Sequence, residues 1–175
     1  MQAACSIRCA QGIAEAKREK AAKQAVAQDK RETRAKLEKM KTAKDLKPAA
    51  KRIAQKYARY RDLSAGYGCI SCGQEFRSVY GGAFDGGHLR SKGSAQHLAL
   101  DLRNIYCQCV HCNRDLGGNV LEFRRGLIER RGAEFVEALE VDQRPRKHDV
   151  AYLRKYMRII GKRANRFEKR FKSMI

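Results

Sequence analysis

The spacing of apolar residues separates long helical segments from a glycine-rich centre. Residues 12–46 are rich in Ala, Lys, Arg and Glu, and they contain no Pro and no Gly after Gly12. These are strong helix formers, but the apolar face of such a helix is mostly alanine and can bury little surface. Leucines at heptad spacing are absent, so the segment is not typical of a coiled coil. We expect a basic helix that is mobile or becomes ordered on nucleic acid.

Two further helices are expected on either side of the centre. Pro48 marks the start of the first, which ends near residues 63–66. Its apolar residues recur at helical spacing and predict a stripe that docks on a core: Ile53, Tyr57 and Tyr60. Pro145 and Asp149 open the last helix, whose remaining surface is covered by Arg and Lys. Its apolar stripe consists of Val150, Leu153, Met157 and Ile160.

Residues 66–118 hold most of the glycines, and there we expect short strands and turns in place of long helices. The pattern predicts strands near 75–80 and 83–89, a loop over about 91–101 and a cysteine knuckle at 107–114. After the knuckle, Asn119 is a plausible helix cap with Glu122 three residues on. A helix then uses Val120, Phe123, Leu127 and Ile128 as its buried face and stops near Gly132. Together these elements predict an α+β fold.

Charge is distributed unevenly along the chain. The net charge is +20, of which residues 1–62 carry +11, residues 63–143 carry −1 and residues 144–175 carry +10. Two basic arms around a neutral centre favour a polyanion partner, because neutralising phosphates releases counterions. The alternative is that these helices only present solvated faces that keep the protein soluble. We therefore divide the chain into a helical arm (1–47), a central core with its docking helix (48–143) and a basic C-terminal helix (144–175).

Membrane association is not indicated. No apolar run reaches the roughly 18 residues that span a bilayer, and the N-terminus lacks a secretory apolar segment. We expect a cytoplasmic protein with no membrane partner. In that compartment, seven cysteines are more typical of metal ligands than of disulfides.

Two Cys-x-x-Cys pairs have the spacing of a structural zinc site: Cys69/Cys72 and Cys109/Cys112. Each pair lets two thiolates reach one metal from a single turn, and two such turns complete a tetrahedron. Four protein ligands leave no open position, so this Zn²⁺ is expected to be structural. The alternative is two unrelated buried pairs.

Other cysteines and a histidine fit the zinc site less well. Cys107 forms only a Cys-x-Cys with Cys109, and His111 lies inside the second turn as a less suitable ligand. Cys5 and Cys9 form a single pair, which cannot fill a four-ligand site, so we assign them no metal.

Between the two zinc turns lies Asp85-Gly86-Gly87-His88. Residues three apart on a regular strand face opposite sides, but two glycines permit a bulge that would bring both side chains to one face. A carboxylate that holds Mg²⁺ or Mn²⁺ beside a neutral imidazole that accepts a proton from water suits phosphodiester hydrolysis. Asn113 directly follows the last zinc cysteine, and its amide oxygen can bind the same cation. Taken alone, His88 is typical of a hydrogen-bonded core histidine and Asn113 of a turn residue.

These motifs resemble the HNH, or ββα-metal, nuclease motif. The shared pattern is Cys-x-x-Cys, Gly-His, Asn and Cys-x-x-Cys-Asn. The resemblance implies that His88 is the general base, that Asn104 fixes the loop carrying it, and that Asn113 binds the catalytic metal. Many HNH enzymes place Asp directly before the catalytic His, whereas here Gly87 precedes it and Asp85 is three residues back.

A narrower resemblance is to the lambdoid phage NinG, or Rap, family. It covers roughly residues 51–140 and rests on C-I-S-C-G at 69–73, D-x-G-H at 85–88, R-N-I at 103–105, Q-C-V-x-C-N at 108–113 and G-N-V at 118–120. The resemblance implies a recombination endonuclease that nicks D-loops and Holliday junctions in the cytoplasm of the host cell. Members of the family tend to begin with a small zinc ribbon, and the cysteines at 5 and 9 resemble only its second half.

Four basic residues lie within a few positions of the proposed ligands and are candidates for DNA contacts: Arg90, Lys92, Arg103 and Arg114. Phosphate contacts position a strand but carry no sequence information, so we expect recognition of shape, and branched DNA suits two basic arms. Arg114 is the candidate for stabilising charge in the transition state. A zinc-stabilised binding module without catalysis and an RNA-directed nuclease remain as alternatives. A homodimer would suit symmetric cutting, but nothing in the sequence requires one.

Overall fold

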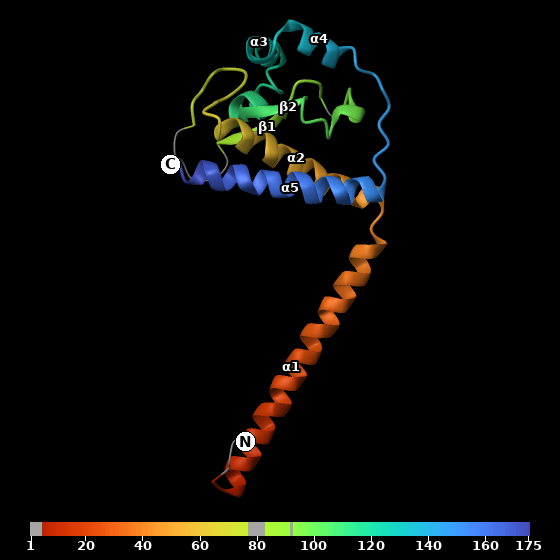
Figure 1. The fold of residues 1–175 in the computed structure, drawn as a ribbon, viewed down its shortest axis with the longest axis vertical. Coiled ribbons are helices and arrows are strands. Elements are labelled where there is room, and N and C mark those ends of the chain that lie inside the picture. Colours follow the sequence, from red (N-terminus) through yellow and green to blue (C-terminus); the bar gives the residue numbers. More distant parts are fainter. Residues whose placement is uncertain (1–4, 77–82, 92) are drawn as a thin grey trace. The chain divides into compact units, whose positions relative to one another are not determined.

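The computed structural model describes residues 5–76, 83–91 and 93–175 (Figure 1). The chain divides into two compact units between Lys41 and Thr42. Each unit has its own local structure and is described by itself.

The first unit consists mainly of helix α1 (Ile7–Met40), and none of its residues is buried. Ser6 caps the helix, and its hydroxyl accepts a hydrogen bond from the backbone N–H of Cys9 at 3.2 Å. The predicted helix is therefore present, and it has the exposed faces expected of a segment whose apolar residues are mostly alanine.

The second unit begins with helix α2 (Ala43–Leu63). Thr42 and Asp45 form a reciprocal capping box, in which Asp45 Oδ2 accepts from the Thr42 N–H at 2.9 Å. Pro48 lies inside the helix, so the prediction that a helix starts at Pro48 was wrong. The predicted boundary at 47/48 likewise falls within α2, because the capping box satisfies the first free N–H groups one turn earlier.

The buried face of α2 is made largely of alanine, which allows close packing against its neighbours. Its buried apolar residues are Leu46, Ala50, Ala54, Ala58 and Leu63. The predicted stripe of Ile53, Tyr57 and Tyr60 lies beside this face and is only partly buried. Two of its rings contact helix α5 (Val150–Lys172), with centroid distances of 5.5 Å for Tyr57–Phe167 and 6.1 Å for Tyr60–Phe171.

A two-stranded antiparallel sheet forms the centre of this unit, built from β1 (Phe84–His88) and β2 (Ile105–Cys109). β1 confirms the strand predicted near 83–89. The other predicted strand, near 75–80, falls mainly on residues 77–82, which lie outside the described residues.

Helix α2 covers the two open edges of this small sheet. Gln55 and Arg59 donate to carbonyl oxygens of β1 at 3.2 and 3.1 Å. Arg61 donates to the carbonyl oxygen of Ile105 at 2.9 Å, and the Asp62 carboxylate accepts from the N–H of Cys107 at 2.7 Å. Side chains of one helix thus satisfy edge groups that a sheet of two strands leaves unpaired.

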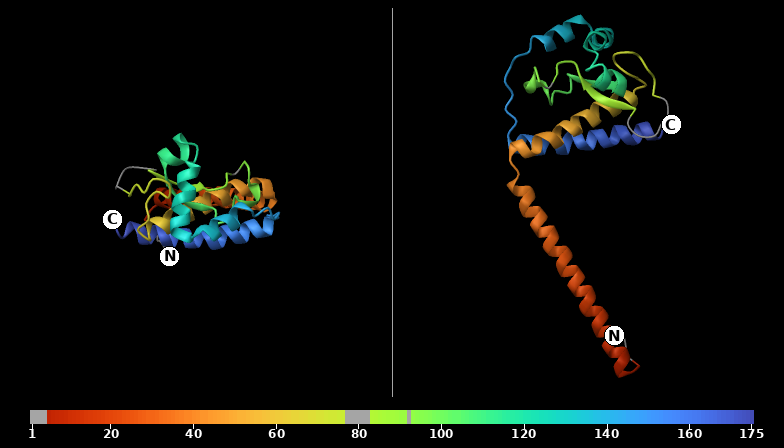
Figure 2. Two further views of the ribbon diagram at one scale, coloured as in Figure 1. Left: turned by 90° about the horizontal axis from the view of Figure 1, so that it is seen from above. Right: turned by 180° about the vertical axis from the view of Figure 1, so that it is seen from behind.

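The sheet lies between two helical layers, as the views in Figures 1 and 2 show. One layer is α2 with α5, and the other is α3 (Val120–Arg131) with α4 (Ala133–Glu140). Tyr106 of β2 packs with α3 and α4, whereas Ile105 packs with α2 and α5. Neighbouring residues of β2 therefore belong to different cores, as the alternation of side chains along a strand requires.

The helix predicted after the cysteine knuckle is α3, and it ends at Gly132 as expected. Asn119 occupies the N-cap position as predicted, but it has φ 40° and ψ 56°, and its side chain makes no capping hydrogen bond. Of the predicted buried face, Phe123 and Leu127 are buried, whereas Val120 is exposed.

Helix α5 is capped as predicted, because Asp149 accepts from the N–H of Tyr152 at 2.7 Å. The fold is therefore α+β, rich in helices with one small sheet, as the sequence indicated. In the described part of the chain, no helix combines the length and the apolarity needed to cross a membrane.

Candidate functional site

Four sulfur atoms meet at one end of the sheet. The Sγ atoms of Cys69, Cys72, Cys109 and Cys112 all lie within 4.8 Å of one another, and Cys72 and Cys109 are 3.8 Å apart. In a tetrahedral zinc site with Zn–S bonds of about 2.3 Å, sulfur atoms are separated by about 3.8 Å. The four predicted ligands therefore fit one metal ion such as zinc.

The other candidate ligands lie outside this cluster. Cys107 is buried in β2 opposite Gly86, and burial raises the pKa of its thiol. The ring of His111 is mostly exposed and contacts Asp115 at 3.1 Å. Cys9 lies on α1, in the other unit of the chain.

Two polar residues that the sequence did not assign to the metal site, Asn119 and Gln108, support the thiol cluster. Asn119 Nδ2 lies 3.5 Å from Cys112 Sγ, so the residue predicted to cap α3 donates to a sulfur atom. Gln108 is fully buried in β2 and donates to Ser71 Oγ at 2.8 Å and to the carbonyl oxygen of Gly118 at 2.6 Å. It thus connects the first cysteine turn to the segment after the second.

Beside the cluster, Asp85 and Asn113 come together. Asn113 lies in a π-helical turn, η2 (His111–Asp115), and its Nδ2 is 2.9 Å from Asp85 Oδ2. Arg114 binds both carboxylate oxygens, at 2.7 and 3.1 Å. Burial alone would raise the pKa of Asp85, but the hydrogen bonds from Arg114 and Asn113 outweigh it and lower that pKa below its ordinary range.

These side chains open into a pocket of about 370 Å³. Its lining is basic and comes from β1, η2 and one face of α2: Arg52, Gln55, Lys56, Arg59, Asp85, Gly86, Asn113 and Arg114. The contribution of α2 was missed in the sequence. A signal for it exists, because the four α2 residues recur at helical spacing and so share one face.

The two glycines of β1 do not form the expected bulge. The strands pair one residue to one from Phe84↔Cys109 to His88↔Ile105. The glycines instead allow close approach: a Cβ on Gly86 would lie 2.6 Å from the Cα of Gln55, and one on Gly87 would meet the side chain of Gln108.

His88 therefore projects from the opposite face of β1 to Asp85. It shares its face with Gly86, which lines the pocket, but it is not itself among the lining residues. Its Nε2 lies 3.3 Å from the carbonyl oxygen of Ala99. A carbonyl only accepts, so in this contact Nε2 is the donor.

Asn104 is completely buried and holds the loop that follows β1. Its Oδ1 accepts from the N–H of Arg90 at 2.8 Å, and its Nδ2 donates to the carbonyl oxygens of Arg90 at 3.0 Å and Leu98 at 3.3 Å. These bonds fix the backbone that begins two residues after His88.

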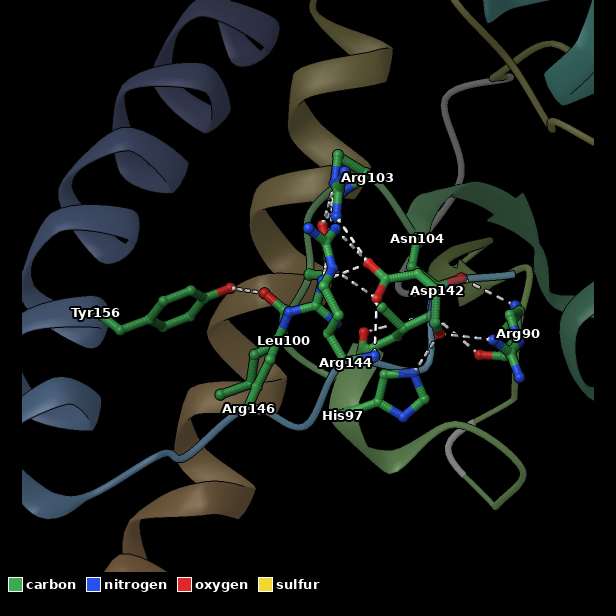
Figure 3. Close-up of polar contacts among 11 residues, drawn as sticks. Arg90, His97, Leu100, Arg103, Asn104, Asp142, Arg144, Arg146 and Tyr156 are labelled. Carbon is green, nitrogen blue, oxygen red and sulfur yellow. Dashed lines mark hydrogen bonds and ion pairs between the residues drawn. The ribbon is translucent and has the colours of Figure 1, made fainter. Parts of the chain in front are cut away.

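The four predicted DNA-contacting residues lie in different places. Arg114 reaches the pocket, whereas Lys92 lies outside the described residues. Figure 3 shows Arg90 and Arg103 beside the segment that joins α4 to α5. There Arg90 donates to the carbonyl oxygens of residues 140 and 142, and Arg103 pairs with Asp101 at 2.7 Å.

Comparison with known proteins identifies relatives in phages. A family model described as Bacteriophage Lambda NinG protein matches residues 1–169. Protein ninG of Salmonella phage P22 is 41% identical over 86 residues, which is 49% of this chain and 38% of that protein. Protein ninG of Escherichia phage lambda is 40% identical over 82 residues, covering 47% of this chain and 36% of that protein. The aligned part thus spans little more than a third of these relatives, and no solved structure matches the chain.

Proposed function

Because this chain belongs to the NinG family of phage proteins, we propose that it is a divalent-metal-dependent endonuclease that nicks branched DNA during recombination. The observation that carries the proposal is the meeting of Asp85 and Asn113, 2.9 Å apart, in a basic pocket beside the four thiols. Oxygen ligands for a hard cation then lie next to groups that attract phosphate.

Zinc would be held by the four cysteines and would act structurally. Burial and the neighbouring thiols both raise the pKa of Cys109. A divalent cation favours the thiolate forms of such a group and closes the 36-residue segment between Cys72 and Cys109. Because Asn113 directly follows Cys112, zinc fixes the position of the carboxamide in the pocket.

Mg²⁺ or Mn²⁺ would be held by Asp85 and by the amide oxygen of Asn113 after rotation of the amide group. When bound, the cation supplies Lewis-acid stabilisation of charge on the phosphate. Arg114, whose side chain is 62% exposed, now occupies both oxygens of Asp85. It would release the carboxylate and turn to the phosphate, which is the role proposed for it from the sequence.

His88 would accept a proton from the attacking water, although it projects from the opposite face of β1 to Asp85 and does not line the pocket. The contact with Ala99 orients its ring, and Asn104 holds the following loop. Arg52, Lys56 and Arg59 would hold the flanking phosphates from α2. We propose that the enzyme acts in the cytoplasm of the host cell.

The test is nicking of an end-labelled four-way junction with Mg²⁺ or Mn²⁺, by the wild type and by His88→Ala. We expect the wild type to nick and the variant to bind the junction equally well without nicking. If both bind and neither nicks with either metal, the chain is a zinc-stabilised binding module. Equal cleavage of a linear duplex at the same salt concentration would exclude the preference for branched DNA, and cleavage of RNA alone would favour an RNA-directed nuclease.

A further inference from the structure

A second basic surface lies away from the proposed active site, around the segment that joins α4 to α5. Figure 3 shows its guanidinium groups converging on Asp142. Arg144 donates to both oxygens of this carboxylate at 3.1 and 3.0 Å, and Arg146 donates to Oδ2 at 2.7 Å. Arg146 also lies 3.3 Å from Asp101, which pairs with Arg103.

In this cluster the Asp142 carboxylate is buried and the side chains of Arg103 and Arg144 are exposed. The side chain of Asp142 is 2% exposed, whereas that of Arg144 is 77% exposed and that of Arg103 is 49% exposed. Arg146 is partly buried, with 24% of its side chain exposed. An approaching anion would therefore meet arginine donors whose orientation is already fixed from behind. Less side-chain entropy is lost on binding when donors are held in this way.

A ladder of stacked rings adjoins these arginines. His148 stacks on Tyr152 with centroids 5.0 Å apart and planes 23° apart, and Tyr152 stacks on Tyr156 at 5.9 Å and 29°. Tyr156 is anchored by its hydroxyl, which donates to the carbonyl oxygen of Leu100 at 2.9 Å. Tyr152 is 42% exposed.

We propose that this surface, formed by Arg103, Arg144, Arg146, His148 and Tyr152, binds a single-stranded segment of DNA. The exposed guanidinium groups of Arg103 and Arg144 contact successive phosphates. A base extends the ladder by stacking on His148, the outermost ring, which rests on Tyr152. Fixed cations beside aromatic rings are the combination that binds unpaired strands, because each base offers a face for stacking. The inference rests on the proposed function, since branched recombination intermediates expose unpaired strands, but it concerns binding and not cleavage.

The primary test is the affinity of full-length protein for labelled oligothymidylate about a dozen nucleotides long, compared with a duplex of the same length, without added Mg²⁺. Tyr152→Ala should weaken oligothymidylate binding about fivefold or more and leave duplex binding unchanged. Tyr152→Phe should bind like the wild type. An equal loss on both DNAs, or no loss on either, would overturn the proposal.

Arg144→Ala tests the phosphate contact without disturbing the core, because this side chain is largely exposed. It should weaken oligothymidylate binding about threefold to tenfold and lower the salt dependence by about one counterion. The matched control is Arg125→Ala, which removes the same charge from an exposed arginine paired with Glu122 at 3.0 Å on α3. If both variants lose the same affinity, only the net charge matters and the surface is not a site.

The variant Asp142→Asn tests whether DNA affinity depends on the fixed geometry of the arginines or on net charge alone. If charge alone decided affinity, removing a carboxylate would strengthen DNA binding, whereas loss of the fixed arginine geometry would weaken it. We expect weaker binding, with thermal melting and circular dichroism showing that the variant is folded at the assay temperature. Tighter binding by the folded variant would contradict the preorganised surface. A further outcome is that the wild type fails to nick junctions while Tyr152→Ala still weakens oligothymidylate binding. That result would refute the proposed function and leave the binding surface supported.

Discussion

Asp85 and Asp142 are both carboxylates surrounded by arginine, yet their environments differ. The side chain of Asp85 is 20% exposed, and its partners are Asn113 and a largely exposed Arg114. Asp142 is almost completely buried, and three arginines lie within 3.5 Å of its oxygens. The first carboxylate can exchange its partners at little cost, whereas the second has no accessible face.

This difference in exposure indicates which of the two carboxylates a ligand can reach. Hydrogen bonds from arginine lower the pKa of both Asp85 and Asp142, so the direction of the shift does not distinguish them. What distinguishes them is access: a pocket of about 370 Å³ lies against Asp85. Around Asp142, the carboxylate is covered and the side chains of Arg103 and Arg144 are exposed to solvent. Aspartate beside arginine can thus leave the carboxylate accessible to a ligand, as at Asp85, or bury the carboxylate and expose the guanidinium groups, as at Asp142.

The largest effect should come from disrupting the four-cysteine cluster, which adjoins Asn113 and Asp85 but not Asp142. Replacing Cys109 with Ser should lower the melting temperature by more than about 10 °C, since structural zinc contributes on the order of 10 kcal/mol in small zinc modules. Bound zinc and melting temperature would be measured together. Cys107→Ser is the matched control, because this buried cysteine lies two residues away and outside the cluster; if it loses zinc equally, the assignment of ligands is wrong.

The next largest effect should be a loss of DNA nicking when Asp85 is replaced. Asp85→Asn should reduce nicking of a four-way junction by about a hundredfold or more while binding changes by less than about twofold, because the variant weakens the cation site but keeps the shape. Single-turnover nicking and junction affinity are the measurements. Asp115→Asn, an exposed carboxylate on the same turn η2, should nick like the wild type. Similar losses in both variants would mean that Asp85 has no special role.

A smaller effect should be a difference in melting temperature between the variants that replace each carboxylate. Asp142→Asn should lower the melting temperature by about 5 °C or more, because it removes a buried charge that pairs with three arginines, one of which, Arg146, is itself partly buried. Asp85→Asn, measured without added Mg²⁺, should lower it less, because Arg114 is exposed and can turn to water. Equal losses would show that burial does not distinguish the two sites.

The smallest effect should be the pH dependence of the difference in melting temperature between the wild type and Asp142→Asn. Each carboxylate has a folded-state pKa below its ordinary value of about 3.9, so its stabilisation is present above that value and is lost as pH falls through the lowered pKa. The difference in melting temperature between the wild type and Asp142→Asn should therefore shrink as pH falls below about 4. A difference that grows on acidification would contradict the network.

Much of the helical architecture could be read from the sequence. The stripe of α5 and its cap at Asp149 follow from periodicity and from a side chain that satisfies free N–H groups, and both are local properties. The cysteine spacing likewise predicted the cluster, because Cys-x-x-Cys places two sulfur atoms on one turn whatever the rest of the fold. Pro48 misled because the capping box of Thr42 and Asp45 starts the helix five residues before the proline.

The pocket was decided by tertiary structure. Sequence alone determined that Asn113 lies at the second cysteine turn, because it directly follows Cys112. Only the fold decided that β1 pairs without a bulge, that α2 contributes one wall, and that Asn119 turns to a sulfur atom. The reason is physical: which face a strand side chain takes depends on register, and which helix covers an edge depends on long-range packing that no local pattern encodes.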